Sequence, residues 1–166
     1  MLIFLPFSLS FFSLWHVLYY RDIESQIIST ARELGIGIVA YSPLGRGFLS
    51  ATFSSVADLA PGDFRLKRPR FSEENFAKNV QEKFFEYAKK KECSPAQLAL
   101  AWLHGQGDDI FPIPGTKTAA RVEENLGALL VDLSEIEKQE IGLMVDIGLG
   151  DRYEAAGMAS AFNSRM

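Results

Sequence analysis

Hydroxyl and cationic side chains gather in residues 114–125, where a short apolar run gives way to a helical pattern. Thr116, Lys117 and Thr118 stand where that helix should begin, and Arg121 follows four residues after Lys117. A helix N-terminus offers N–H donors and positive potential, and residues four apart share one helix face. Two cations on that face suit a dianionic phosphate monoester. The alternative is an ordinary capped helix with two surface cations, and spacing alone does not decide between them.

A second candidate is the stretch 41–48, which follows the apolar run 36–41. Loops at the carboxyl ends of parallel strands hold the active sites of α/β folds. Gly45 and Gly47 would let backbone N–H groups approach a phosphate, and Arg46 could add positive charge. A purely structural turn would have the same composition, so both interpretations stay open here.

Alternating helices and short strands must position these two segments. The pattern predicts a helix over residues 22–34, a strand over 36–41 and a strand over 110–114. Further helices are expected over residues 72–91, 94–103 and 134–147, and from Thr118 through Leu129. The expected capping residues are Asp22, Ser94, Thr118 and Ser134, and a left-handed Gly35 should follow the first helix. The helix positions expected to face inward are Ile23, Ile27, Ala31, Leu34, Phe76, Val80, Phe84, Ala88, Val122, Leu126 and Leu129.

Residues 42–71 have no sustained period and predict a long loop, which in a compact domain is functional or disordered. A basic cluster near its end is either a solvated face or an anion site. Its members are Arg65, Lys67, Arg68 and Arg70. Helices alternating with buried strands indicate an α/β fold with a parallel sheet, yet two or three strands are too few for a closed barrel.

Bulk composition excludes several classes of function. A formal net charge of −4 argues against a nucleic-acid footprint. A lone cysteine, Cys93, excludes an intrachain disulfide and a multi-cysteine metal site, and it is compatible with a reducing, cytoplasmic location. No metal site is expected.

The first 20 residues form a hydrophobic, irregular start that has no charged side chain. The length suffices for a membrane-spanning helix, but Pro6, His16 and several serines interrupt the run, and a basic n-region is missing. The favoured interpretation is a buried strand plus hydrophobic sequence. A membrane anchor is the alternative.

Three ordered motifs resemble the aldo-keto reductase family. Residues 33–47 resemble the region of its seventh strand, residues 94–103 the helix before its eighth strand, and residues 114–126 its adenosine-phosphate motif. Within that family the chain is most similar to the fungal and plant branch related to pyridoxal reductase and auxin-induced oxidoreductases. The resemblance implies the C-terminal half of a TIM (β/α)8 barrel, about strands 6 to 8, with residues 21–166 as a partial NADP(H)-binding domain and a remnant of strand 6 at 13–15.

The resemblance also implies roles for individual residues. Tyr41 would stack on the nicotinamide, and the backbone after it would line the pyrophosphate path. Lys117 and Arg121 would surround the 2′-phosphate, and Glu124 and Asn125 would hold the adenine end. The expected NADP(H) contacts are Tyr41, Ser42, Leu44, Gly45, Arg46, Gly115, Thr116, Lys117, Arg121, Glu124 and Asn125.

Two departures from the family pattern matter for function. The family reduces carbonyl substrates with an Asp, Tyr, Lys and His tetrad from the first half of its barrel, and no residue here aligns with that tetrad. Leu9 and Phe11 stand where the family has Gln and Glu, which is what a truncated or mis-spliced gene sequence would produce. The expected function is an NADP(H)-dependent oxidoreductase that is inactive as this chain alone; the alternative is a non-catalytic nucleotide-binding or interaction fragment, with or without a membrane tether.

Overall fold

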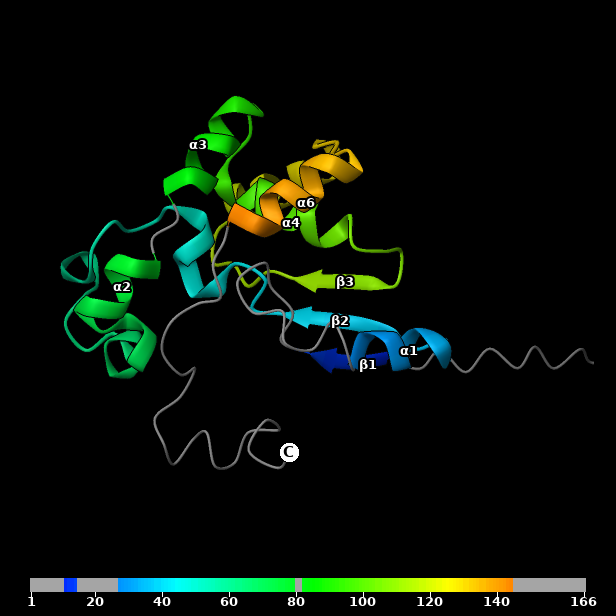
Figure 1. Ribbon diagram of the computed structural model, residues 1–166. Coiled ribbons are helices and arrows are strands. Elements are labelled where there is room, and N and C mark those ends of the chain that lie inside the picture. Colours follow the sequence, from blue (N-terminus) through cyan, green and yellow to red (C-terminus); the bar gives the residue numbers. More distant parts are fainter. Residues whose placement is uncertain (1–10, 15–26, 80–81, 145–166) are drawn as a thin grey trace, which may run out of the picture.

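The computed structural model describes residues 11–14, 27–79 and 82–144, and these residues contain a three-stranded parallel sheet (Figure 1). The strands are β1 (Phe11–Leu14), β2 (Gly37–Tyr41) and β3 (Ile110–Ile113), in the order β1-β2-β3. Ile38 is paired in register with Ile110 and with Phe12. The predicted parallel α/β architecture is therefore confirmed for these residues.

Short helices connect and cover the strands. A single turn of helix, α1 (Ser29–Glu33), precedes β2, and Gly35 follows it with φ +65°, the left-handed conformation that glycine adopts readily. The predicted helix start at Asp22 lies outside the described residues. The other helices are α2 (Glu73–Asn79), α3 (Glu82–Lys90), α4 (Pro95–His104), α5 (Ala119–Leu126) and α6 (Glu135–Met144).

The two faces of the sheet differ in burial. Ile38, Ala40 and Ile110 point to one face, where they are almost fully buried with Ile28 and Ala31. On the opposite face of β3, Phe111 is 44% and Ile113 52% exposed. One face therefore has a helical cover, and the other leaves large apolar side chains open to solvent.

The predicted loop 42–71 is better described as a chain of short 3-10 helices that joins the main core. These helices are η2 (Gly45–Ser50), η3 (Val56–Asp58), η4 (Phe64–Lys67) and η5 (Pro69–Phe71). Phe48 and Phe71 from this segment are buried with rings 4.4 Å apart, and both pack with Phe76 of α2. Sequence period did not reveal this packing because its contacts are between elements rather than along one element.

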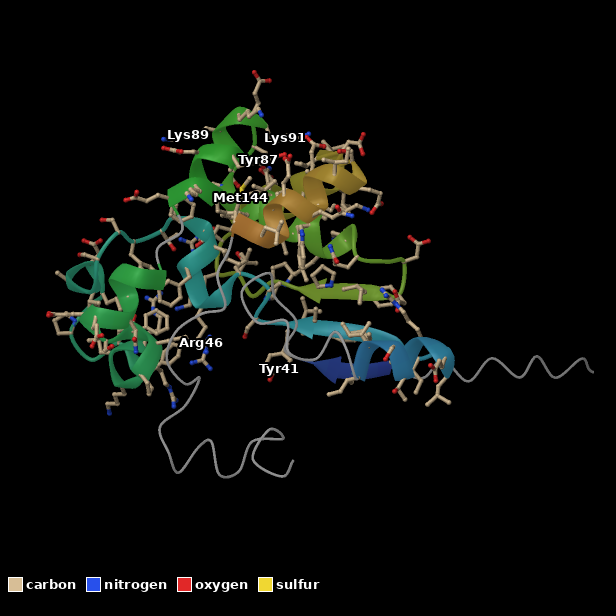
Figure 2. All side chains as sticks on the ribbon, in the orientation of Figure 1. Tyr41, Arg46, Tyr87, Lys89, Lys91 and Met144 are labelled. Carbon is tan, nitrogen blue, oxygen red and sulfur yellow. The ribbon has the colours of Figure 1, made fainter. Side chains whose placement is uncertain are left out.

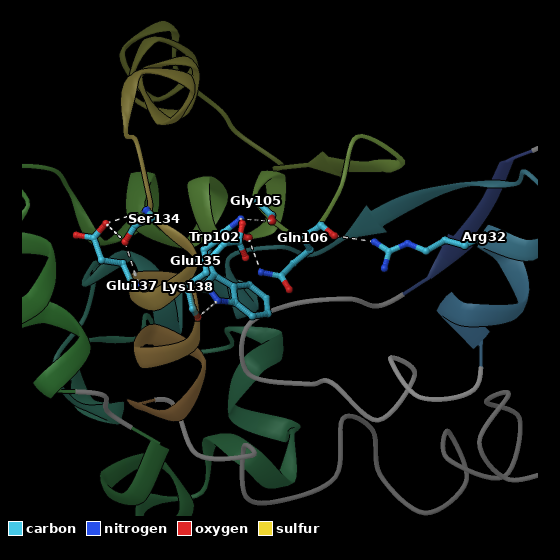
Figure 3. A network of polar contacts seen from close by, with 8 residues as sticks. All are labelled: Arg32, Trp102, Gly105, Gln106, Ser134, Glu135, Glu137 and Lys138. Atoms are coloured by element: carbon cyan, nitrogen blue, oxygen red, sulfur yellow. Dashed lines mark hydrogen bonds and ion pairs between the residues drawn. The ribbon is translucent and has the colours of Figure 1, made fainter.

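Local capping signals were predicted correctly. Ser94 and Gln97 form a reciprocal capping box at the start of α4, with Pro95 at its first position. Ser134 and Glu137 bond in the same reciprocal way before α6. The two helices are then joined by the Trp102 indole Nε1, which donates to the Lys138 carbonyl at 2.8 Å (Figure 3).

Several inward-facing assignments were wrong. Leu34 is 67% exposed, and Val122, Leu126 and Leu129 on and after α5 are 44–64% exposed. Periodicity identifies the apolar side of a helix but not what covers it, and α5 has no buried residue. The single helix predicted over 72–91 is described as α2 and α3; residue 80, one of its four apolar positions, lies outside the described residues.

The basic cluster is a solvated face only in part, since Lys67 is exposed and Arg68 is half-buried. Arg70 is 4% exposed, and the Arg65 side chain is 22% exposed in an ion pair with Asp63.

Among the described helices, none has the length and apolar character to cross a membrane. The anchor hypothesis concerns residues 1–20, of which only 11–14 are described, so it remains a hypothesis.

Candidate functional site

A cleft of about 880 Å³ opens where strands β2 and β3 end. It lies between the segment that follows β2 and the segment that leads from β3 into α5. Carboxyl ends of adjacent parallel strands are where α/β folds place their ligands. The lining residues are Ser42, Pro43, Leu44, Arg46, Gly47, Ser50, Thr52, Gly62, Asp63, Phe64, Arg65, Ala96, Pro114, Gly115, Thr116, Lys117, Arg121, Glu124 and Asn125.

One wall of the cleft is the start of α5. Thr118 caps this helix, since its Oγ1 accepts from the backbone N–H of Arg121 at 3.4 Å. The Thr116 hydroxyl donates to the Thr118 carbonyl at 3.3 Å, which holds the turn before the helix. Lys117 and Arg121 are exposed at the cleft, and neither forms an ion pair with another residue of the described part of the chain. Their charges are available to an anion.

The facing wall is the turn after β2, whose backbone is bent into left-handed conformations. Ser42 and Arg46 have φ of 54° and 59°, which non-glycine residues adopt at a cost. Gly47 has φ of 109°, and a Cβ there would collide with the Phe53 ring, so only glycine fits. The Arg46 guanidinium lies 5.4 Å from the centroid of the Phe64 ring. Figure 2 shows Arg46 beyond the carboxyl end of β2, whose last residue is Tyr41.

An ion pair that sequence reasoning missed braces this wall. Arg65 Nη2 lies 2.7 Å from Asp63 Oδ2, and Arg65 Nη1 also donates to the Arg46 carbonyl at 3.2 Å. The Arg65 guanidinium packs 4.8 Å from the Phe53 ring centroid. Hydrogen bonds from the Arg65 side chain and backbone, with smaller help from the charges of Arg65 and Lys117, lower the pKa of Asp63 to about 2.

A local signal for this brace exists in the sequence. Asp63 accepts from the backbone N–H of Arg65 at 2.9 Å, the two-residue pattern typical of aspartate at the start of a turn. The Gly62-Asp63 pair that precedes the basic cluster could have predicted a capped turn. It could not have predicted that the turn lies beside Lys117.

The structure brings most of the predicted residues together from two distant segments. Tyr41 and Gly45 are not among those that line the cleft: Tyr41 is the last residue of β2, and Gly45 is buried in the turn with φ of 59°. The predicted residues that line it are Ser42, Leu44, Arg46, Gly115, Thr116, Lys117, Arg121, Glu124 and Asn125.

The cleft has an excess of cationic groups. Arg46, Arg65, Lys117 and Arg121 line it, against the two carboxylates of Asp63 and Glu124. No tyrosine or histidine is among the lining residues. Elsewhere in the described residues, no three His, Cys, Asp or Glu side chains gather in a way that could hold a metal ion. The excess of cationic groups suits electrostatic binding of an anion.

Residues 7–145 match the model of the aldo/keto reductase family, which is most of the chain. The chain belongs to the aldo/keto reductase family. Its three-stranded parallel sheet is consistent with part of that family's barrel.

Solved structures of aldo-keto reductases share this fold. The glycerol dehydrogenase of Gluconobacter oxydans is 21% identical with a TM-score of 0.69; the alignment covers 87% of this chain and 44% of that one. An aldo/keto reductase from Klebsiella pneumoniae, solved with NADP and acetate, is 19% identical with a TM-score of 0.58, covering 87% and 43%. A variant of Gox0644 solved with NADPH is 17% identical with a TM-score of 0.59, covering 92% and 44%. The chain thus spans about two fifths of the length of the structures it matches.

Proposed function

We propose that this chain is the NADP(H)-binding portion of an aldo-keto reductase and that its cleft holds the adenosine-phosphate end of the cofactor. The observation that carries the proposal is the convergence of Lys117 and Arg121, at the start of α5, with Arg46 from the turn after β2. The 2′-phosphate of NADP(H) is a dianion at neutral pH, and a helix N-terminus with two adjacent cations is a site for such a group.

The donor chemistry of the cleft fits the rest of that end of the cofactor. Thr116 offers a hydroxyl and Gly115 an unobstructed backbone, since a Cβ at Gly115 would meet nothing within 4 Å. Glu124 and Asn125 lie one turn further along α5 and provide an acceptor and an amide for the adenine. Each of these groups reaches the same cleft, as a single bound nucleotide requires.

The segment after β2 would serve the other end of the cofactor. Ser42 and Leu44 line the cleft and would border the pyrophosphate, with Gly45 shaping the turn. Tyr41, at the end of β2, would stack on the nicotinamide. In this proposal β1, β2 and β3 correspond to the sixth, seventh and eighth strands of the family barrel, and the chain belongs to the fungal and plant branch that its motifs resemble.

The reaction we assign to the complete enzyme is reduction of a small aldehyde or ketone by hydride transfer from NADPH. Bound NADPH would supply the hydride; this chain's residues would bind and orient the cofactor. A general acid is worth about 10²–10⁴-fold in rate, and none of the cleft residues is a tyrosine or histidine. We therefore propose that this chain binds NADP(H) without turning over carbonyl substrate. We also propose, from its single cysteine, that the protein belongs to a reducing compartment such as the cytoplasm.

Calorimetric titration with NADPH, followed by a carbonyl-dependent absorbance assay on the same sample, tests both parts. We expect saturable binding and no loss of NADPH absorbance with a panel of aldehydes. Failure to bind at millimolar NADPH would contradict the binding assignment. Aldehyde-dependent oxidation of NADPH would contradict the inactivity of the chain alone.

A further inference from the structure

Gln97 lies at a junction between α4 and α5, next to the cleft. It is the third residue of α4, directly after Ala96, which lines the cleft. Its side chain has two different partners: Oε1 accepts from the backbone N–H of Ser94 at 2.9 Å, and Nε2 donates to the carbonyl of Glu124 at 3.1 Å. One amide thus closes the cap of α4 and also holds the backbone of a cleft residue in α5.

Gly127 makes room for this amide. Its φ of −58° is available to any residue, so its backbone does not require glycine. A Cβ on Gly127 would, however, overlap Nε2 of Gln97, closer than real Cβ contacts come. The glycine is therefore explained by the space that the Gln97 side chain occupies and not by a turn.

The position of α5 has few other supports. No residue of α5 is buried, and its apolar residues Val122 and Leu126 are 44% and 59% exposed. A helix that is weakly held by apolar packing depends more on individual hydrogen bonds for its placement. The carbonyl that Gln97 holds belongs to Glu124, which lines the cleft together with Arg121 one turn earlier.

We propose that Gln97 is a positioning residue for nucleotide binding: its amide, seated against Gly127, sets the placement of α5 and so of the groups that bind the adenosine end. This inference rests on the proposed function of the cleft. Gln97 itself is not assigned any contact with the nucleotide.

Gln97→Glu separates the two bonds that the side chain makes. Glutamate keeps an acceptor for the Ser94 N–H and is itself a common residue at this position of a capping box. At neutral pH it has no proton to donate to the Glu124 carbonyl. The substitution therefore removes the α5 bond while it keeps the α4 cap.

Gln106→Glu is the matched control. Gln106 also donates its side-chain amide to a backbone carbonyl, that of Trp102 at 3.0 Å, but it lies beyond the opposite end of α4 from the cleft (Figure 3). Both substitutions add one negative charge and remove one amide-to-carbonyl bond. A general structural effect would act through both. Loss of positioning would act through Gln97→Glu and also through Gly127→Ala, which adds no charge, whereas repulsion of the anionic ligand by the new carboxylate would act through Gln97→Glu alone.

The test is calorimetric titration of the full chain and its variants with 2′,5′-ADP, with thermal unfolding in parallel. We expect Gln97→Glu to weaken binding about 5- to 10-fold, the size of one lost hydrogen bond, and Gln106→Glu to leave it within about 2-fold. Should Gln97→Glu fail to fold, Gly127→Ala, whose backbone tolerates alanine, displaces the same amide and should give the same loss.

The outcomes separate the two proposals. No binding of 2′,5′-ADP by the unmodified chain would overturn the function of the cleft, and this inference with it. Binding by the unmodified chain with equal affinity in Gln97→Glu and Gly127→Ala would overturn the positioning role alone. An equal loss in Gln97→Glu and Gln106→Glu would also overturn it.

Discussion

The two walls of the cleft are built in opposite ways. The wall after β2 is held from within: Arg65 bonds to Asp63 and to the Arg46 carbonyl, and the segment is anchored in the core by Phe48. The wall formed by α5 has no buried side chain, and within the described residues its cations have no ion-pair partner. In the first wall Asp63 and Arg65 stabilise the wall itself, whereas in the second wall Lys117 and Arg121 are left for a ligand. Substitutions of the packed and ion-paired residues of the first wall should therefore change stability, and substitutions of the two cations of the second should change affinity.

The largest effect on stability is expected in the core of the first wall. Phe48 is 3% exposed and packs against Phe71 and Phe76. Phe48→Ala should lower the free energy of unfolding by about 3–5 kcal/mol, because it leaves a cavity among three rings. Chemical denaturation measures this change. Leu130→Ala, at a side chain that is 89% exposed, is the control and should change it by less than about 0.5 kcal/mol. Similar values for the two variants would contradict the role of Phe48 in anchoring the first wall.

The largest effect on affinity is expected at α5. Replacing both Lys117 and Arg121 with alanine should weaken NADPH binding by roughly 100-fold or more, since charge-assisted hydrogen bonds contribute about 1.5–3 kcal/mol each. Unfolding free energy should stay within about 0.5 kcal/mol.

The control for that double variant has alanine at both Lys83 and Lys89, which are exposed residues of α3 that do not line the cleft. These two substitutions remove the same amount of positive charge. Isothermal titration with NADPH compares the two double variants. If both weaken binding equally, net charge rather than a site attracts the cofactor.

A smaller effect is expected from the cap of α5. Thr118→Ala removes the acceptor for the Arg121 N–H and should cost about 1 kcal/mol, measured as faster hydrogen exchange of the α5 amides. Thr118→Ser keeps the hydroxyl and should exchange like the unmodified chain. Unchanged exchange in Thr118→Ala would mean that tertiary contacts, and not the cap, hold the start of α5.

The smallest effect concerns pH and the brace of the first wall. The folded pKa of Asp63 is lowered to about 2 from 3.8, so its stabilisation is present above about pH 4 and is lost as pH falls toward 2. Because solvent reaches the pair of Asp63 and Arg65, we expect the pair to contribute about 1 kcal/mol or less to the free energy of unfolding. Glu137, whose pKa a hydrogen bond from Lys91 lowers to about 2, titrates in the same range. The stability difference between the unmodified chain and Asp63→Asn, followed from pH 6 to pH 2, isolates Asp63; a difference that does not shrink at low pH would contradict the assignment.

The sequence predicted what local signals encode. Capping at Ser94 and Thr118, the left-handed Gly35 and the strand after it follow from short-range hydrogen bonding and backbone preference, and the structure confirms them. The resemblance to aldo-keto reductases was confirmed at the level of the family.

What the sequence did not predict depends on contacts between distant segments. No periodic pattern in the sequence of residues 42–71 predicts that this segment packs into the core. None predicts that Asp63 and Arg65 lie at the cleft. The residue pattern of α5 identified the apolar face of the helix correctly, but the prediction that this face is buried was wrong. A pattern within one helix does not specify which neighbours cover it. The assignment of individual residues to parts of the cofactor remains a prediction.

The most direct test of the account is the ratio of the Kd of NADH to the Kd of NADPH for the unmodified chain. The two ligands differ only in the 2′-phosphate, which we assign to Lys117 and Arg121. We predict that NADPH binds at least 10-fold more tightly at low salt and that the ratio falls toward one in the variant that has alanine at both positions. Equal affinity for the two cofactors in the unmodified chain would contradict the central claim that the α5 wall of the cleft is a 2′-phosphate site.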